Sequence, residues 1–149
     1  MNTAPNDTPA ATTTAPPLQA TFGDSRPVVL VAEDDRSVRR YLEIILQRAG
    51  FEVLTAADGL EAMKAALSNG VDAVVTDAHM PHLGGHELCR FLRRHPRLSR
   101  LPVVLLSGSE PLAETSDADP ERADVYLSKP VRPEELAACL SRLLLARAA

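Results

Sequence analysis

Acidic side chains, one hydroxyl and one lysine follow directly after short apolar segments of this sequence. Glu33 and Asp34 come after the first apolar run, Asp77 follows the third, Ser107 the fourth and Lys129 the fifth. Clustered carboxylates repel one another, so such a group takes up protons or binds a hard cation. Oxygen ligands in an incomplete cage favour Mg²⁺, and a metal and a lysine beside a carboxylate would neutralise a phosphoryl group. The set indicates attack by a carboxylate on phosphorus, which gives an acyl phosphate.

These side chains can meet only if the apolar runs are strands of one sheet. Continuous apolar runs predict strands at residues 28–32, 53–54, 73–76, 103–106 and 125–127. Apolar residues at helical spacing predict helices around residues 38–49, 60–67, 88–92 and 136–144, and His95-Pro96 should end the third. The alternation predicts an α/β fold, a doubly wound five-stranded parallel sheet with helices on both faces. Ligands of such sheets lie at the carboxyl ends of the strands.

Length and composition exclude several classes of protein. The chain has 149 residues, the size of one ordinary domain, and its 16 basic and 20 acidic residues give a net charge of −4. This balance argues against a general nucleic-acid binder. No apolar run approaches the roughly 20 residues that span a bilayer, so we expect no membrane segment. Cys89 and Cys139 make no disulfide framework and are expected to be reduced, partly buried thiols of a cytoplasmic protein.

Residues 1–26 differ in composition from the rest of the chain. They are rich in Thr, Pro and Ala and contain almost no large apolar side chains. Such a segment cannot bury enough surface to offset the entropy lost on ordering. It also lacks the basic start and apolar region of a signal peptide. We therefore expect a disordered tail that serves as a leader or linker, with a partner-binding motif as the alternative, and a folded domain at residues 27–149.

The strand-end residues, taken in order, resemble the receiver domain of two-component response regulators. The resemblance rests on Glu33-Asp34, on Asp77 with Met80-Pro81 and Gly85, on Ser107, and on Lys129-Pro130. It implies a flavodoxin-like (βα)5 fold and a phosphoryl group accepted from a histidine kinase or phosphotransfer protein with Mg²⁺. It also implies that the domain is not a conventional enzyme, because it would catalyse only its own phosphorylation and dephosphorylation.

The resemblance implies a role for each matching residue in metal binding. Asp77 would be the phosphoacceptor. Asp34 would bind Mg²⁺ directly, and Glu33 would act mostly through metal-bound water. The backbone carbonyl of His79 would complete the ligands that the protein provides. Asp35, third in the acidic run, is expected to cap the first helix instead.

The resemblance also implies a switch. Lys129 would pair with the phosphoryl oxygens, and the Lys129-Pro130 peptide would be cis. Ser107 would move toward the phosphoryl group, and Tyr126 would turn inward behind it. The face near the fourth helix and fifth strand would then change shape for a downstream protein. His79 and Ser109 occupy the positions at which side chains of the family tune loss of the phosphoryl group.

The sequence departs from the family pattern at two places. Gly84-Gly85 replaces the more usual acidic-Gly pair, which should make the loop more permissive. Residues 110–124, where a fourth helix belongs, are acidic and contain Pro111 and Pro120. We expect this helix to be short or irregular. The chain ends soon after the last expected helix, so we predict a stand-alone receiver without an output domain. A homodimer is left open.

The same residues leave other functions to consider. A phosphorylation-independent module of the same fold and the receiver of a hybrid histidine kinase are the alternatives. A phosphohydrolase is disfavoured because His79 stands where the second acid of such enzymes lies. Zinc binding by His79, His82 and His86 is disfavoured because their spacing begins in a loop. Five arginines between residues 90 and 100 are expected to form a solvated face or a docking surface for an acidic partner, not a nucleic-acid site.

Overall fold

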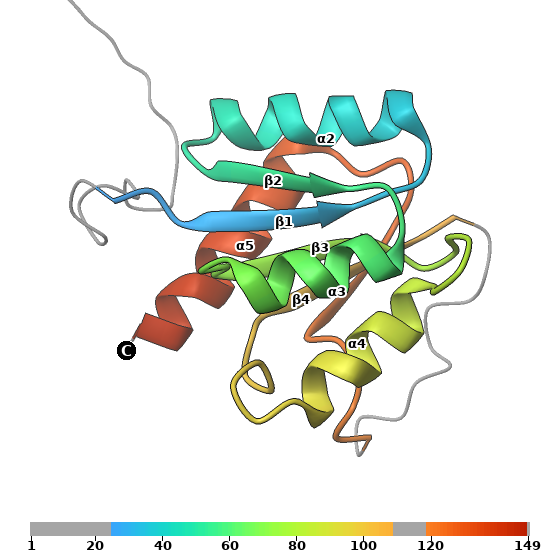
Figure 1. Cartoon of the computed structure of the whole chain (residues 1–149). Coiled ribbons are helices and arrows are strands. Elements are labelled where there is room, and N and C mark those ends of the chain that lie inside the picture. Colours follow the sequence, from blue (N-terminus) through green and yellow to red (C-terminus); the bar gives the residue numbers. More distant parts are fainter. Residues whose placement is uncertain (1–24, 109–118, 149) are drawn as a thin grey trace, which may run out of the picture.

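The computed structural model describes residues 25–108 and 119–148, which fold as one parallel sheet flanked by helices (Figure 1). The strands are β1 (Val28–Ala32), β2 (Glu52–Ala56), β3 (Ala73–Asp77), β4 (Val103–Ser107) and β5 (Val125–Ser128). Their order in the sheet is β2-β1-β3-β4-β5, and every neighbouring pair is parallel. This confirms the predicted doubly wound α/β fold.

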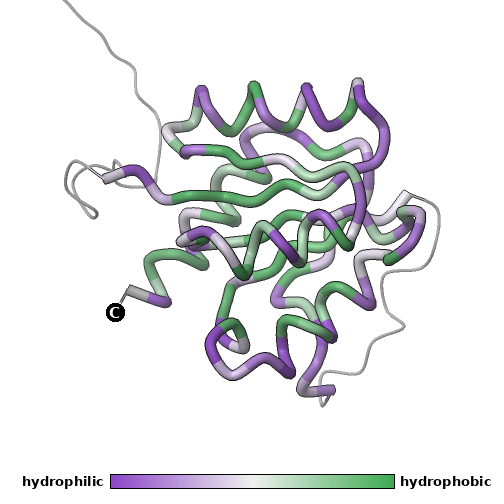
Figure 2. The backbone as a smooth tube through the Cα atoms, in the orientation of Figure 1, coloured by the Kyte–Doolittle hydropathy of each residue, from purple (hydrophilic) through white to green (hydrophobic). Residues whose placement is uncertain are grey.

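Helices cover both faces of the sheet. On one face α3 (Gly59–Ser68) and α4 (Gly85–Arg94) pack on a core that includes Leu30, Val74 and Leu105. On the other face α2 (Arg36–Arg48) and α5 (Pro133–Ala148) pack on Val29, Val75 and Val104. Both faces of the central strands are therefore buried, which is why these strands are continuous apolar runs. Figure 2 shows the central strands as largely hydrophobic bands, whereas hydrophilic and hydrophobic residues alternate along α2.

The register of the strands brings their carboxyl ends to one edge. Ala32, the last residue of β1, pairs with Thr76 of β3, so Glu33 and Asp77 follow side by side. Asp77 pairs with Leu106, and Ser107 pairs with Ser128, the residue before Lys129. The chain turns to opposite sides of β1 to form β2 and β3. This reversal is the switch point at which ligands of doubly wound sheets bind.

Side-chain caps determine where helices α2 and α3 begin at the carboxyl edge of the sheet. The Asp35 carboxylate accepts hydrogen bonds from the amides of Ser37 and Val38, at 2.9 and 3.1 Å, which confirms it as the cap of α2. Asp58 caps α3 by accepting from the Glu61 amide at 2.8 Å. At the other end of the molecule, α4 stops at Arg94 just before His95-Pro96, as predicted.

Gly85 is needed for close packing at the end of β3. A Cβ atom at this position would lie 2.2 Å from the Asp77 carbonyl oxygen, far inside contact distance. The Gly85 amide donates to the Ala78 carbonyl at 2.8 Å, so the start of α4 lies directly against the strand end. The interpretation of Gly84-Gly85 as a merely permissive loop is therefore incomplete, because a side chain at 85 would push α4 away from Asp77.

Three arginines of α4 bind the segment that leads into β5. Arg94 and Arg90 contact the Glu121 carboxylate, at 2.5 and 3.6 Å. Arg93 pairs with Asp124 at 2.7 Å and donates to the Arg122 carbonyl at 3.0 Å. The expectation of a solvated basic face is wrong for Arg93, whose side chain is only 10% exposed, whereas Arg90 and Arg94 stay exposed while they pair with Glu121.

Two sequence predictions lie mostly beyond the described residues. The structure does not describe residues 1–24 of the predicted tail or residues 109–118 of the predicted fourth helix. Residues 119–124, which are described, form no helix. None of the helices in the described part of the chain has the length and apolar character needed to cross a membrane.

Candidate functional site

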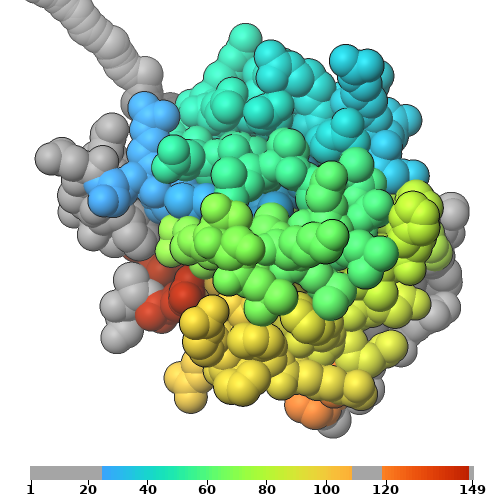
Figure 3. All heavy atoms as spheres, viewed as in Figure 1, coloured from blue at the N-terminus to red at the C-terminus, as the bar shows by residue number. Residues whose placement is uncertain are grey.

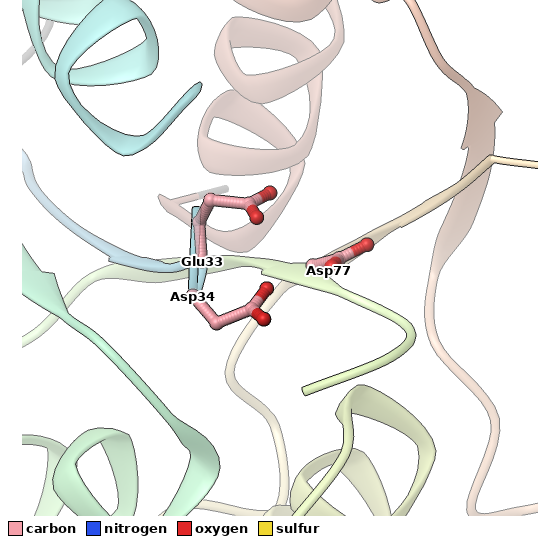
Figure 4. Close-up of side chains that lie close together, drawn as sticks. All are labelled: Glu33, Asp34 and Asp77. Atoms are coloured by element: carbon pink, nitrogen blue, oxygen red, sulfur yellow. The ribbon is translucent and has the colours of Figure 1, made fainter. Parts of the chain in front are cut away.

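Three carboxylates meet at the carboxyl edge of the sheet. Glu33 and Asp34 follow β1, and Asp77 ends β3. One oxygen from each carboxylate lies within 4.8 Å of the other two. Figure 4 shows the Glu33 and Asp34 carboxylates directed toward the side on which Asp77 lies. Glu33 and Asp77 are buried, with 1% and 7% of their surface exposed, whereas Asp34 is open to solvent.

Lys129 supplies a positive charge between two of these carboxylates. Its Nζ lies 3.0 Å from Asp77 Oδ1 and 3.0 Å from Glu33 Oε1. The Lys129 amide donates to the Ser107 carbonyl at 2.9 Å, which fixes the residue beside β4. The Lys129-Pro130 peptide is cis, as predicted. The contact with Glu33 was not anticipated from the sequence, because the resemblance assigned Lys129 to the phosphoryl oxygens alone.

Burial and neighbouring charges shift the pKa values of Glu33 and Lys129. Burial raises the pKa of Glu33 above its ordinary 4.5, against the hydrogen bonds from the Asp35 amide and Lys129, and the Asp77 charge adds to the rise. Burial acts to lower the pKa of Lys129, but its hydrogen bonds to Glu33 and Asp77 outweigh this and raise the pKa above 10.5. The lysine therefore stays charged at neutral pH, and the buried carboxylates are short of compensating charge.

These residues fit a magnesium ion. The donors are all carboxylate oxygens, which Mg²⁺ prefers, and Asp34 faces solvent, so water can complete the shell. A divalent cation would also stabilise the ionised form of Glu33, which burial disfavours. Within residues 25–108 and 119–148, this is the one group of three or more His, Cys, Asp or Glu side chains close enough to hold a metal. The three loop histidines, all among the described residues, are not part of such a group.

The loop after β3 borders the acidic group. His79 is exposed and lines a hollow of about 400 Å³ together with Met80 and His86. Farther along, His82 has a positive φ of 71° and its Nδ1 lies 3.1 Å from Asp58 Oδ2 at the start of α3. This contact ties the loop to a neighbouring helix. Metal binding by the His79 carbonyl stays a prediction.

The two switch residues lie in β4 and β5. Ser107 is buried at the end of β4, in the strand beside Asp77. Tyr126 is half-buried against the core beneath α3 and α4, and its hydroxyl accepts a hydrogen bond from the Ala123 amide at 3.0 Å. Ala123 lies before the start of β5, so this contact holds the hydroxyl away from the carboxyl edge. An inward turn of Tyr126 stays a prediction, and Ser109 lies outside the described residues.

The fold and the site together define a class of protein: doubly wound α/β domains with an acidic pocket and a paired lysine at the switch point of the sheet. The sequence comparison gives this class its family. Residues 29–141 match the family described as the response regulator receiver domain. The chain belongs to this family, whose members act in two-component systems, as the resemblance of its strand-end residues predicted.

Individual relatives agree with this assignment. The chain is 40% identical over 116 residues to the response regulator MprA of Mycobacterium sp. strain KMS, covering 78% of this chain and 50% of that one. It is 31% identical over 108 residues to protein PilG of Pseudomonas aeruginosa, covering 72% and 80%. A crystal structure of a putative response regulator from Chloroflexus aurantiacus has a TM-score of 0.75 and 32% identity, covering 81% and 99%. The chain spans about half the length of several curated relatives that it matches.

Proposed function

We propose that this domain accepts a phosphoryl group on Asp77 from a histidine kinase or phosphotransfer protein and thereby switches a protein–protein contact. The observation that carries the proposal is the 3.0 Å contact of Lys129 with Asp77 inside a group of three carboxylates. A lysine and a metal-binding group beside one buried carboxylate are the parts that phosphoryl transfer to that carboxylate requires.

In the proposed reaction, a carboxylate oxygen of Asp77 forms a bond to phosphorus. The bond that breaks joins phosphorus to the donor histidine nitrogen, and its electron pair leaves with that nitrogen. Lys129 lies where it can neutralise charge on the transferred group, and Glu33 holds the lysine from its other side at 3.0 Å. Asp34, Glu33, Asp77 and the His79 carbonyl would hold Mg²⁺, which supplies further charge neutralisation when bound.

After transfer, the residues around the phosphoryl group would carry the signal. The Ser107 hydroxyl would bind the phosphoryl oxygens, and Tyr126 would leave the Ala123 amide and turn inward. His79 and Ser109 would set how long the phosphoryl group survives. We place this reaction in the cytoplasm, and the domain turns over no other substrate. A downstream protein would bind the altered surface near β5.

Intact mass measurement tests this proposal. The protein is incubated with a small-molecule phosphodonor, with and without Mg²⁺, beside Asp77→Asn and the control Asp72→Asn, which changes a carboxylate before β3 at the opposite edge of the sheet. One added phosphoryl group is expected on the native chain and on the control, only with Mg²⁺, and none on Asp77→Asn. No added mass on the native chain, together with no Mg²⁺-dependent binding of a fluoride phosphate mimic, would favour a phosphorylation-independent module instead.

A further inference from the structure

A groove of about 830 Å³ lies at the amino edge of the sheet, away from the acidic site. One wall is the turn at residues 96–102, between α4 and β4, and the other is the last part of α5. Figure 3 shows this turn, in yellow, beside the end of α5, in red. Arg97, Arg100 and Arg147 line the groove, and Leu143 and Ala146 supply apolar residues to it.

The turn at residues 96–102, which carries Arg97 and Arg100, is held in place by hydrogen bonds and buried side chains. Arg93, whose side chain is only 10% exposed, donates to the carbonyls of Leu101 and Ser99 at 2.7 and 3.3 Å. Leu98 and Leu101 are buried and anchor the turn on the core beneath α4. Arg97 and Arg100 project from this fixed turn and are exposed. The groove is therefore preformed, which lowers the entropy lost when a ligand binds.

The charge of the groove is strongly positive. Among the described residues that line the groove, Asp124 is the one acidic residue, and its Oδ2 accepts hydrogen bonds from Arg93 at 2.7 Å and the Val103 amide at 2.8 Å. Arg147 donates to the Asp72 carbonyl at 2.8 Å and lies 3.9 Å from the Asp72 carboxylate. Within the described residues, the guanidiniums of Arg97 and Arg100 have no carboxylate within 4.0 Å.

We propose that this groove docks an acidic segment of a partner protein, with carboxylates on Arg97 and Arg100 and an apolar side chain against Leu143 and Ala146. Arginine forks bind carboxylates by paired, charge-assisted hydrogen bonds. A protein segment fits better than nucleic acid, because the described residues of the lining include no aromatic side chain for base stacking and the whole chain carries a net charge of −4. Since the groove and Asp77 lie at opposite edges of the sheet, docking does not rest on the proposed phosphorylation.

Peptide binding to the full chain tests the groove. The probe is a short fluorescein-labelled peptide of alternating Glu and Leu, titrated by fluorescence anisotropy at low and high salt. Arg97→Gln with Arg100→Gln removes the two unpaired guanidiniums, and Arg40→Gln with Arg48→Gln removes the same charge from α2. We expect the groove variant to raise the Kd about tenfold or more and the control to change it less than about twofold. Arg97→Lys with Arg100→Lys should keep part of the binding, because the charge remains.

Several results would overturn the proposal. Equal loss of binding in both Gln variants would mean that net charge alone attracts the peptide. Displacement of the peptide by oligothymidylate at lower concentration than by unlabelled peptide would assign the groove to nucleic acid. A concentration-dependent dimer that the groove variant abolishes would assign it to a second copy of this chain. An unchanged thermal midpoint in the groove variant is required, since these side chains are exposed.

Discussion

The ammonium of Lys129 lies 3.0 Å from the Asp77 carboxylate, although the two residues are far apart in the chain and follow different strands. The same ammonium contacts Glu33 at the same distance. One of the two lysines of the sequence is thus the positive partner of a buried acidic group, and the other, Lys64, is exposed on α3.

Replacing Lys129 by Met should strengthen Mg²⁺ binding while it slows phosphorylation. The substitution removes a positive charge from the acidic group, so the cation should bind about tenfold more tightly. Without Lys129, no ammonium neutralises the negative charge on the incoming phosphoryl group, so phosphorylation should be slower. Isothermal titration with MgCl₂ measures the affinity, and Lys64→Met is the matched control. An unchanged or weaker Mg²⁺ affinity in Lys129→Met would show that the ion does not bind among Glu33, Asp34 and Asp77.

The raised pKa of Glu33 predicts a pH dependence of stability. Because burial raises this pKa above 4.5, the folded state binds the proton more tightly than the unfolded chain does. Stability contributed by Glu33 therefore falls as pH rises from about 4.5 through the raised pKa. Glu33→Gln lacks this titration, so it should gain stability relative to the native chain across that window.

Urea unfolding of both proteins in the presence of a chelator, at several pH values between about 4 and 7, measures the difference. Saturating Mg²⁺ should abolish the trend or reverse it, because the ion stabilises the ionised carboxylate. A stability difference that does not vary with pH would refute the assignment of the raised pKa to Glu33.

Arg93 should contribute far more to stability than its neighbour Arg90. Arg93 is nearly buried and joins the Asp124 carboxylate to three backbone carbonyls around the start of β4 and β5. Arg93→Gln removes an ion pair with the exposed Asp124 carboxylate and leaves backbone carbonyls without donors, at a cost of about 1–3 kcal/mol. Arg90→Gln loses one exposed contact of 3.6 Å and should stay close to the native chain. Chemical unfolding of the two variants decides this, and equal stabilities would contradict it.

The two thiols should be unreactive in the folded protein. Cys89 and Cys139 are each 2% exposed, and burial raises the pKa of Cys89 to about 11 and also raises that of Cys139. At about pH 8, alkylation of the folded protein should be roughly a hundredfold slower than alkylation of the protein unfolded in urea. In the folded state little of each thiol is ionised, and the reagent cannot reach the sulfur. Mass spectrometry after iodoacetamide treatment follows the reaction. Rapid alkylation of the native chain would contradict the packing beneath α4 and α5.

The sequence was sufficient to predict the strands and the residues that meet at their ends. Five apolar runs at regular intervals leave few alternatives to a parallel sheet, and the sheet itself brings Glu33, Asp77 and Lys129 together. The cap at Asp35 was predictable for a similar reason, since a carboxylate before a helical stripe binds local amides.

Contacts between side chains that are distant in the chain could not be predicted from the sequence. Arg93 was predicted to lie on a solvated face because nothing in a single helix shows that Asp124 will lie beside it. The same holds for the bond from the Ala123 amide to the Tyr126 hydroxyl, which depends on how the turn before β5 packs. The requirement for Gly85 arises from the approach of α4 to the Asp77 carbonyl, a distance set by tertiary packing.

The most direct test of the central claim is to locate the phosphoryl group. After phosphorylation with Mg²⁺, borohydride reduces an aspartyl phosphate to homoserine, and peptide mapping identifies the converted residue. We expect conversion at Asp77 alone, and we expect none without Mg²⁺ or in Asp77→Asn. Conversion at Asp34 or elsewhere with Asp77 intact, or phosphorylation that no carboxylate carries, would contradict it.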